Sequence, residues 1–171
     1  MATDPPKRYI TTNSPTTGQS VFSTAVPDSP TPYGFPGVAI ELATIYASAS
    51  FPHNITDDAD LKTYQNAIEN PPGIVLENGT IVRTFDLGPG CSTPMHRTIS
   101  VDCGVIIEGS LVLELDSGEE RVLKRGDMFV QRGTMHKWTN PSETETAKMF
   151  VTVQPAKEVV IDGKAVGEEG V

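Results

Sequence analysis

The sequence predicts an all-β fold, an antiparallel barrel of the jelly-roll type with one short helix. Short runs of alternating apolar and polar residues recur along the chain, and glycine, proline and asparagine separate them at regular intervals. A single stretch has the character of a helix. With 171 residues the chain is long enough for one domain with a hydrophobic core, and too short for two domains of ordinary size.

Residues 1–37 are expected to lie outside the barrel, as an N-terminal arm followed by a proline-rich loop. The arm contains two short β-like runs, RYITT and QSVFSTAV, separated by residues 13–18. Proline and glycine in that separation predict a hairpin or an extended arm. Residues 26–37 contain four prolines and two glycines, too many for regular structure, so we expect an ordered loop there.

Residues 38–156 are expected to form the barrel. Its first segment, residues 38–47 (VAIELATIYA), alternates as a strand, although its alanines would also allow a helix. The short helix is expected to begin at the acidic cluster of residues 57–60, because negative charge is favourable at a helix N-terminus. Pro71 and Pro72 are expected to end it.

Two hairpins and a last strand complete the expected barrel. Asn78-Gly79 predicts a tight turn in a hairpin over residues 73–87. A second hairpin is expected over residues 111–125, and residues 147–156 (AKMFVTVQPA) are expected to form the last core strand. The tail, residues 157–171, alternates only weakly and is expected to fray or to pack on a neighbouring subunit.

Two histidines, forty residues apart, organise the middle of the chain. A loop delivers His96 to a sheet, a strand leads away, and the second hairpin returns the chain, so His136 is expected beside the start. Residues at fixed spacing surround both histidines: Gly90, Asp102 and Gly109 in the first half, and Gly126, Asp127, Gly133 and Asn140 in the second.

This spacing resembles the two sequence motifs of the cupin superfamily. Residues 90–109 match the first motif, and residues 126–140 match the second. Thr98 stands where a second histidine ligand is usual, and Gln131 stands where the turn proline is usual. The resemblance implies a cupin-type jelly-roll barrel and a homodimer that exchanges N-terminal strands.

The candidate catalytic residues are His96, His136 and Asp102. Two histidines and one carboxylate can hold one divalent transition metal, iron, zinc, manganese or nickel, and Thr98 would leave a position open. Without a metal, the same three groups can remove one proton and deliver another, because imidazole titrates near neutral pH. The third interpretation is structural, with both histidines only hydrogen-bonded inside the barrel.

Side chains of a strand alternate between its two faces, which suggests further cavity residues. Trp138 shares a face with His136, and Lys137 then points outward. We expect Arg83 and Phe85 to face inward and to orient a substrate; the alternative places Arg83 on the outer face, paired with an acid. The candidate substrate-binding residues are Arg83, Phe85, Thr98, Gln131 and Trp138.

The segments HRTISVD and VQRGTMHKWTN resemble those of small single-domain cupins of fungi, some of which accompany polyketide or other natural-product pathways. The resemblance implies an enzyme acting on a small oxygenated carbon skeleton. We expect a non-redox lyase, such as a dehydratase, or an isomerase. The alternatives are a metal-dependent dioxygenase or other oxidoreductase, and a protein that binds a small ligand without turnover.

The chain carries 13 basic and 22 acidic residues, a formal net charge of -9. This charge repels nucleic acids and anionic membrane surfaces, so a small molecule is the expected partner. No apolar run approaches the length of a membrane span, and the first ten residues lack the apolar core of a signal peptide. We therefore expect a cytoplasmic protein.

The two cysteines and the third histidine are the other reactive side chains. Cys91 and Cys103 are expected to be free thiols packed in the barrel wall, because disulfides are rare in a reducing compartment. A catalytic cysteine beside His96 is the alternative. His53 is expected in a loop, either without a role or over the cavity opening.

Overall fold

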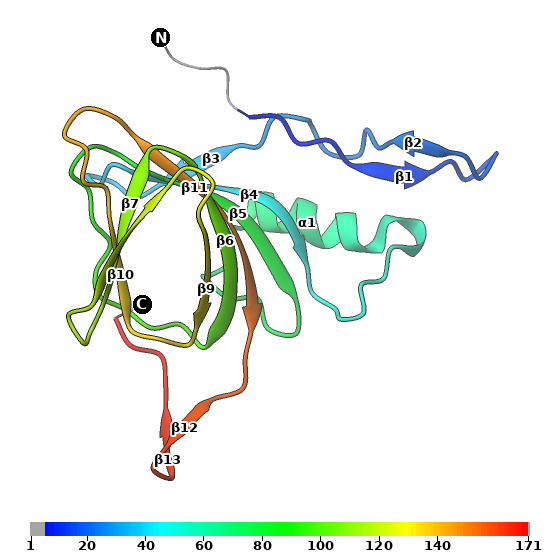
Figure 1. Ribbon diagram of the computed structural model, residues 1–171. Coiled ribbons are helices and arrows are strands. Elements are labelled where there is room, and N and C mark those ends of the chain that lie inside the picture. Colours follow the sequence, from blue (N-terminus) through cyan, green and yellow to red (C-terminus); the bar gives the residue numbers. More distant parts are fainter. Residues whose placement is uncertain (1–5, 171) are drawn as a thin grey trace.

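Two antiparallel sheets face each other across a barrel in the protein (Figure 1). The structure is a computed structural model that describes residues 6–170. Its strands are β1 (Thr11–Asn13), β2 (Ser20–Phe22), β3 (Pro32–Gly34), β4 (Ile40–Ser48), β5 (Thr80–Leu87), β6 (Ser100–Glu108), β7 (Ser110–Leu115), β8 (Glu120–Lys124), β9 (Met128–Arg132), β10 (His136–Thr139), β11 (Ala147–Pro155), β12 (Val159–Ile161) and β13 (Lys164–Val166). A 3-10 turn, η1 (Thr56–Asp58), leads into the α-helix α1 (Ala59–Glu69). Over residues 6–170, the expected all-β fold with one short helix is confirmed.

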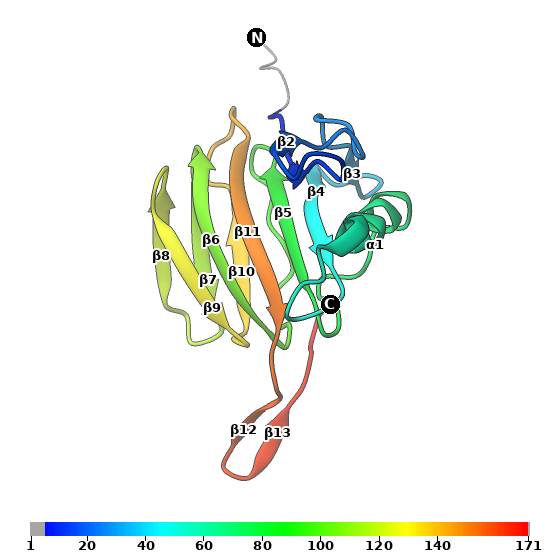
Figure 2. The same cartoon turned by 90° about the vertical axis from the view of Figure 1, so that its right-hand side faces the viewer.

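The larger sheet has six strands in the order β3-β4-β5-β11-β6-β9, and the smaller has three in the order β10-β7-β8. Figure 2 shows the larger sheet from its outer side, with α1 beside β4. The strand β11 lies between β5 and β6 and is antiparallel to both, although it follows them by many residues. Such long-range antiparallel pairing is typical of a jelly roll, as predicted.

The hairpin expected over residues 111–125 is present as β7 and β8. The two strands pair from Ser110 opposite Lys124 to Glu114 opposite Glu120. Gly118 turns the chain with φ 82°, a left-handed conformation that glycine adopts at no steric cost. This hairpin carries the chain away from the first motif and back toward the second.

Apolar side chains from both sheets fill part of the barrel interior. The buried members of this core are Ile40, Leu42, Leu87, Ile106, Leu111, Leu123, Phe129, Trp138, Ala147 and Met149. Full burial of a large apolar side chain contributes about 1.5–3 kcal/mol. Phe129 lies over the sheet because the residue opposite it is Gly104, where a Cβ would come within 2.4 Å of the Phe129 ring.

The helix α1 packs against β4 on the side away from the barrel interior (Figure 1). Ala47 of β4 and Tyr64 and Ala67 of α1 form a second, smaller core. The Tyr64 hydroxyl donates a hydrogen bond of 2.7 Å to the Thr44 carbonyl, and the Arg8 guanidinium lies 5.0 Å from the centre of the Tyr64 ring. The base of the N-terminal arm is therefore fastened to the helix.

The expectations for residues 6–47 are partly confirmed, and residues 1–5 of the expected arm lie outside the described part of the chain. The arm is a hairpin of β1 and β2, which projects beside α1 (Figure 1). The loop expected over residues 26–37 contains the strand β3, so its expected lack of regular structure is wrong. Proline is tolerated in β3 because β3 is an edge strand. The strand expected over residues 38–47 is present as β4, with an irregularity between Thr44 and Tyr46.

The hairpin expected over residues 73–87 is wrong in its first half. Asn78 has a left-handed φ of 58°, as the turn requires, but residues 73–77 form no strand. The second half, β5, pairs with β4 on one side and β11 on the other. Both of its edges are therefore occupied, and residues 73–77 have no place in the sheet.

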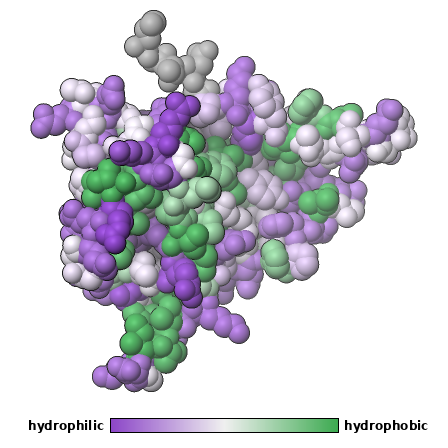
Figure 3. Space-filling model, viewed as in Figure 1, coloured by the Kyte–Doolittle hydropathy of each residue, from purple (hydrophilic) through white to green (hydrophobic). Residues whose placement is uncertain are grey.

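The tail does not fray over its described part, residues 157–170. It forms the hairpin β12–β13, which projects from the barrel and exposes Val160 and Ile161 as an apolar area (Figure 3). The chain then returns to the barrel, where Arg97 and Glu169 exchange two backbone hydrogen bonds of 2.8 and 3.2 Å. None of the helices within residues 6–170 could span a bilayer.

Candidate active site

His96 and His136 lie side by side, as the sequence predicts. The backbone N–H of each residue donates a hydrogen bond of 2.9 Å to the carbonyl of the other, and the ring centres are 4.2 Å apart. His136 begins β10, and His96 belongs to the loop that precedes β6. Backbone hydrogen bonds between the two candidate catalytic histidines thus join the loop before β6 to β10.

Backbone carbonyls fix the protonation of both rings. Nδ1 of His96 is 2.9 Å from the Pro94 carbonyl, and Nδ1 of His136 is 2.9 Å from the Thr134 carbonyl. A carbonyl oxygen only accepts, so each Nδ1 carries a hydrogen. The lone pair of each neutral ring is therefore on Nε2, which has no hydrogen-bond partner among residues 6–170.

Both histidines line a cavity of about 90 Å³ inside the barrel. The cavity is lined by Leu42, Ile74, Arg83, Phe85, Thr93, His96, Asp102, Phe129, Gln131, His136, Trp138, Met149, Val151 and Val153. Every residue that we predicted for a site is in this set except Thr98. The set combines an apolar wall with a few buried polar groups, which is typical of a small-molecule site.

Burial keeps His136 neutral. The pKa of His136 is lowered to about 4, mainly by loss of contact with water; the Thr134 carbonyl opposes this effect, and the neighbouring His96 adds to it. At neutral pH the His136 ring therefore accepts a hydrogen bond at Nε2 and holds no proton there.

Asp102 is the carboxyl group of the cavity. Burial raises the pKa of Asp102, and a hydrogen bond from Ser100 and the charge of His96 oppose the increase. The side chain is 8% exposed, and its Oδ1 has no hydrogen-bond partner in the described chain. Asp102 is thus shifted toward the protonated form, which can donate a proton.

Thr98 is buried behind the cavity wall. Its hydroxyl lies 2.9 Å from that of Ser100, whose interaction with Asp102 opposes the rise in the pKa of that carboxyl group. Our prediction missed Ser100, although alternation from Thr98 through Ser100 to Asp102 could have indicated it. Thr98 occupies the position where the cupin motif usually has a histidine, and its hydroxyl contacts that of Ser100.

Arg83 faces inward, so the alternative on the outer face is wrong. Its terminal nitrogens donate to the carbonyls of Pro72, Gly73 and Ile74, at 2.9, 2.7 and 3.4 Å respectively. The side chain is 4% exposed, and its Nε has no partner in the described chain. Burial lowers the pKa of Arg83 from its usual value. Arg83 thus holds the 72–74 segment and lines the cavity.

The aromatic wall agrees with the predicted alternation and extends it. Phe85 and Trp138 line the cavity, while Lys137 points outward and forms an ion pair of 2.7 Å with Glu114. Phe129, which we did not predict, packs on Trp138 with ring centres 4.9 Å apart. Its position two residues before the predicted Gln131 on β9 was the available signal.

Metal binding through His96, Asp102 and His136 was one predicted role of the site. Carbonyl-bound Nδ1 atoms and free Nε2 atoms suit two histidine ligands. However, no three His, Cys, Asp or Glu side chains in residues 6–170 lie close enough together to hold a metal ion. As placed, the side chains fit a contact with two imidazoles, but they do not fit the expected set of three donors.

The remaining predicted side chains lie outside the cavity lining. His53 Nδ1 is 2.9 Å from the Ser48 hydroxyl, and its ring packs edge-on against Tyr46 and Phe51, so it does not cover the opening. Cys91 and Cys103 are free thiols, as expected, but Cys103 is exposed, not packed in the wall.

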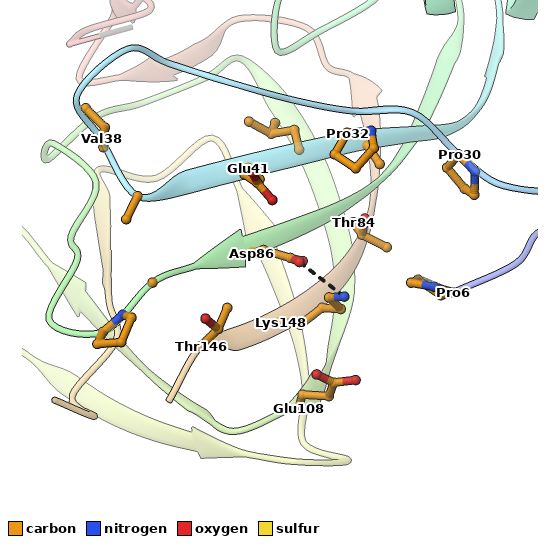
Figure 4. Close-up of a pocket in the computed structure, with 15 residues that line it drawn as sticks. Pro6, Pro30, Pro32, Val38, Glu41, Thr84, Asp86, Glu108, Thr146 and Lys148 are labelled. Atoms are coloured by element: carbon orange, nitrogen blue, oxygen red, sulfur yellow. Dashed lines mark ion pairs between the residues drawn. The ribbon is translucent and has the colours of Figure 1, made fainter. Parts of the chain in front are cut away.

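A wider groove of about 520 Å³ lies on the outer face of the larger sheet (Figure 4). Its charged residues are Glu41, Asp86, Glu108 and Lys148, and an ion pair of 3.1 Å joins Asp86 to Lys148. Burial raises the pKa of Asp86, which Lys148 opposes. The groove contains none of the predicted site residues, so the larger hollow is not where the candidate chemistry lies.

Comparisons with known sequences agree with the motif assignment. Residues 83–153 match a family model described as "Cupin domain". Phomopsin biosynthesis cluster protein D of Diaporthe leptostromiformis is 43% identical over 162 residues, 95% of this chain and 85% of that protein. Oryzines biosynthesis cluster protein J of Aspergillus oryzae is 40% identical over 161 residues, 94% of this chain and 89% of that protein.

Two further similarities are more distant. The cupin-domain-containing oxidoreductase srdB of Neurospora crassa is 38% identical over 120 residues, 70% of this chain and 59% of that protein. Among solved structures, the polyketide cyclase RemF from Streptomyces resistomycificus superposes with a TM-score of 0.51 and 18% identity, covering 83% of this chain and 80% of RemF. The similarity to RemF supports the fold alone.

Proposed function

Because the chain belongs to the cupin family and is similar to fungal biosynthesis-cluster proteins, we propose that it is an enzyme of natural-product biosynthesis. Its reaction is the non-redox loss of water from a small β-hydroxy carbonyl compound, or an isomerisation that moves the same proton. The observation that carries this proposal is the histidine pair, whose Nε2 lone pairs are both free, in a cavity that one buried carboxyl group also lines.

His96 removes the proton alpha to the carbonyl. Of the two imidazoles it is the more exposed, so a proton taken at Nε2 can be released to solvent. His136 is neutral at pH 7 because burial lowers its pKa to about 4. Its Nε2 therefore accepts a hydrogen bond from the substrate hydroxyl and orients it.

Asp102 delivers the second proton. Burial favours its protonated form, so it can protonate the hydroxyl as the carbon–oxygen bond breaks. The electron pair of the broken carbon–hydrogen bond becomes the new carbon–carbon double bond, and the hydroxyl leaves as water. The proton on His96 is released to water, Asp102 takes up a proton from water, and the cycle needs no oxidant or reductant.

The substrate carbonyl lies toward Arg83 and Gln131. Arg83 Nε and Gln131 Nε2 are buried donors without partners in the described chain, and hydrogen bonds from them stabilise negative charge on the carbonyl oxygen. Phe85 and Trp138 hold the carbon skeleton. Thr98 acts through Ser100 on Asp102, because it does not line the cavity.

A panel of β-hydroxy ketones, esters and acids, incubated with the purified protein and analysed by mass spectrometry, tests the proposal. We expect one product lighter than its substrate by one water, formed equally well without oxygen. His96→Gln and Asp102→Asn should each lower the rate about 10²–10⁴-fold, and Lys148→Gln in the outer groove should not. Oxygen consumption coupled to product formation would instead favour the second candidate.

The second candidate is an oxidoreductase, favoured by the relatives that carry that name and by the two free Nε2 atoms. A metal held by His96 and His136 would supply the redox chemistry. Metal analysis of the purified protein, compared with His136→Gln, measures this directly. A ligand-binding protein without turnover and the homodimer also remain predictions, to be checked by ligand titration and by sedimentation.

A further inference from the structure

Arg83 is a buried charge without a countercharge. It is 4% exposed, and it takes part in none of the ion pairs among residues 6–170. Its three contacts are carbonyl oxygens, which accept hydrogen bonds but carry no full negative charge. Buried charges in proteins are normally paired, because an unpaired charge loses its hydration without compensation. An anion bound in the cavity would therefore compensate the buried charge of Arg83.

Arg83 lines the cavity and keeps an unsatisfied buried donor. Both terminal nitrogens are engaged by the 72–74 segment, whereas the buried Nε has no partner. Backbone contacts already fix the guanidinium group of Arg83, so little conformational entropy of this side chain is lost when a ligand binds. A charge-assisted hydrogen bond from Arg83 Nε to an anion would satisfy this donor.

Gln131 provides a second unsatisfied donor in the same cavity. Its side chain is 6% exposed, and its Nε2 has no partner in the described chain. Arg83 and Gln131 come from β5 and β9, on opposite sides of β11 and β6, and both line the cavity of about 90 Å³. Both unsatisfied donors therefore belong to side chains that line the same cavity.

The other lining residues restrict what the anion can belong to. Phe85, Trp138 and Val151 form apolar walls, which suit a hydrocarbon skeleton better than a polyanion such as a phosphate ester. Asp102 has a free Oδ1 that can meet a hydroxyl. The chemistry that matches all of these groups is a short carboxylic acid with a hydroxyl group.

We propose that the cavity selects its substrate as a carboxylate, bound by Arg83 Nε and Gln131 Nε2, so that the substrate class is small hydroxy acids. The inference rests on the proposed function: the carbonyl beside these two donors belongs to a carboxylate. When the alpha proton leaves, a second negative charge develops on the carboxylate oxygens, and the fixed guanidinium offsets it. Loss of the hydroxyl as water then gives an unsaturated acid.

Equilibrium binding tests this selection without requiring turnover. Calorimetry would compare 3-hydroxybutanoate with its neutral isostere 3-hydroxybutanamide, and butanoate with butanamide. We expect each acid to bind at least about tenfold more tightly than its amide, since a hydrogen bond to a charged group is worth a factor of that order. The preference should persist at high salt, because buried pairs are screened less than exposed ones.

Two variants separate this site from other positive charges. Gln131→Glu keeps the shape of the side chain and leaves the contacts of Arg83 with residues 72–74 intact, so it avoids the folding risk of removing Arg83. It should abolish the acid preference while amide binding and the melting temperature stay close to wild type. Lys148→Gln in the outer groove should leave the preference unchanged.

The inference is overturned if the wild-type protein binds the amides as tightly as the acids, if it binds none of the acids, or if Gln131→Glu keeps the preference. Loss of water from a neutral hydroxy ketone without acid preference would preserve the proposed function and reject this inference. Acid preference that survives in His96→Gln, where turnover is lost, would support both.

Discussion

Two hollows lie on opposite faces of the same sheet, and they differ in how their charges are satisfied. On β5, Arg83 and Phe85 face the inner cavity, whereas Thr84 and Asp86 face the outer groove. The groove is larger, about 520 Å³ against about 90 Å³. Its main basic group is already paired, with Lys148 3.1 Å from Asp86, while Arg83 in the cavity has no carboxylate partner in the described chain.

The difference shows that unsatisfied chemistry is a better guide to a site than volume. One oxygen of Asp86 is also buried without a partner, but its other oxygen pairs with Lys148 at 3.1 Å, so the charge of this carboxylate is compensated. In the cavity, Arg83 Nε, Asp102 Oδ1 and Gln131 Nε2 are all buried, and each costs about 1–3 kcal/mol if it stays unpaired. A ligand or ordered water in the cavity recovers that free energy.

The largest effect that separates the two regions is expected from pH. The pKa of His136 falls from 6.5 to about 4 on folding. Between these two pH values the imidazole is therefore mostly protonated in the unfolded chain and mostly neutral in the folded chain. The free energy of unfolding should therefore decrease as pH falls from about 6.5 to about 4, by up to about 3 kcal/mol. Denaturant unfolding at several pH values measures this slope.

His136→Gln provides the control for the pH slope. Burial raises the pKa values of Asp86 and Asp102, and each raised carboxyl group contributes a slope of opposite sign, with stability lost as pH rises. Those contributions are common to both proteins, so the difference between wild type and variant isolates the imidazole. Equal slopes between pH 4 and 6.5 would show that His136 is not kept neutral by burial.

A smaller effect is expected from filling the space beside Phe129. A Cβ at Gly104 would lie 2.4 Å from Phe129 Cζ and 2.7 Å from the Phe150 carbonyl oxygen, so Gly104→Ala must push the ring into the cavity or move the backbone. We expect the free energy of unfolding to fall by about 1–3 kcal/mol, together with weaker ligand binding. The matched control is Gly167→Ala, where a Cβ meets no atom within 4 Å. Similar melting temperatures for the two variants would contradict the packing that we describe.

The features predicted correctly from the sequence are those set by local periodicity. Alternation along single strands placed Phe85 and Trp138 inside and Lys137 outside, and the motif spacing placed His136 beside His96. The prediction that Thr98 lines the cavity was wrong because Thr98 precedes β6, and the alternation of side chains along a strand does not hold outside the strand. The rule is reliable inside a strand and fails at its ends.

The features that were missed depend on partners distant in the chain. Asn78-Gly79 turns the chain as expected, but a hairpin also needs a free strand edge, and β4 and β11 occupy both edges of β5. The carbonyls that hold Arg83 belong to residues 72–74, which no pattern connects with that side chain. Pairing with distant strands and burial by distant residues are set by the whole fold, and so they were not available from a local pattern.

The smallest effect is expected in the outer groove, and it is the sharpest check on the comparison. Asp86→Asn removes the carboxylate that pairs with Lys148 on a partly exposed surface. We expect the free energy of unfolding to change by at most about 1 kcal/mol, since partly exposed ion pairs contribute little. Turnover and acid binding should match those of the wild type, because Asp86 and the cavity lie on opposite faces of β5. A large loss of turnover in Asp86→Asn, measured beside Gln131→Glu, would mean that the outer groove, and not the inner cavity, receives the substrate.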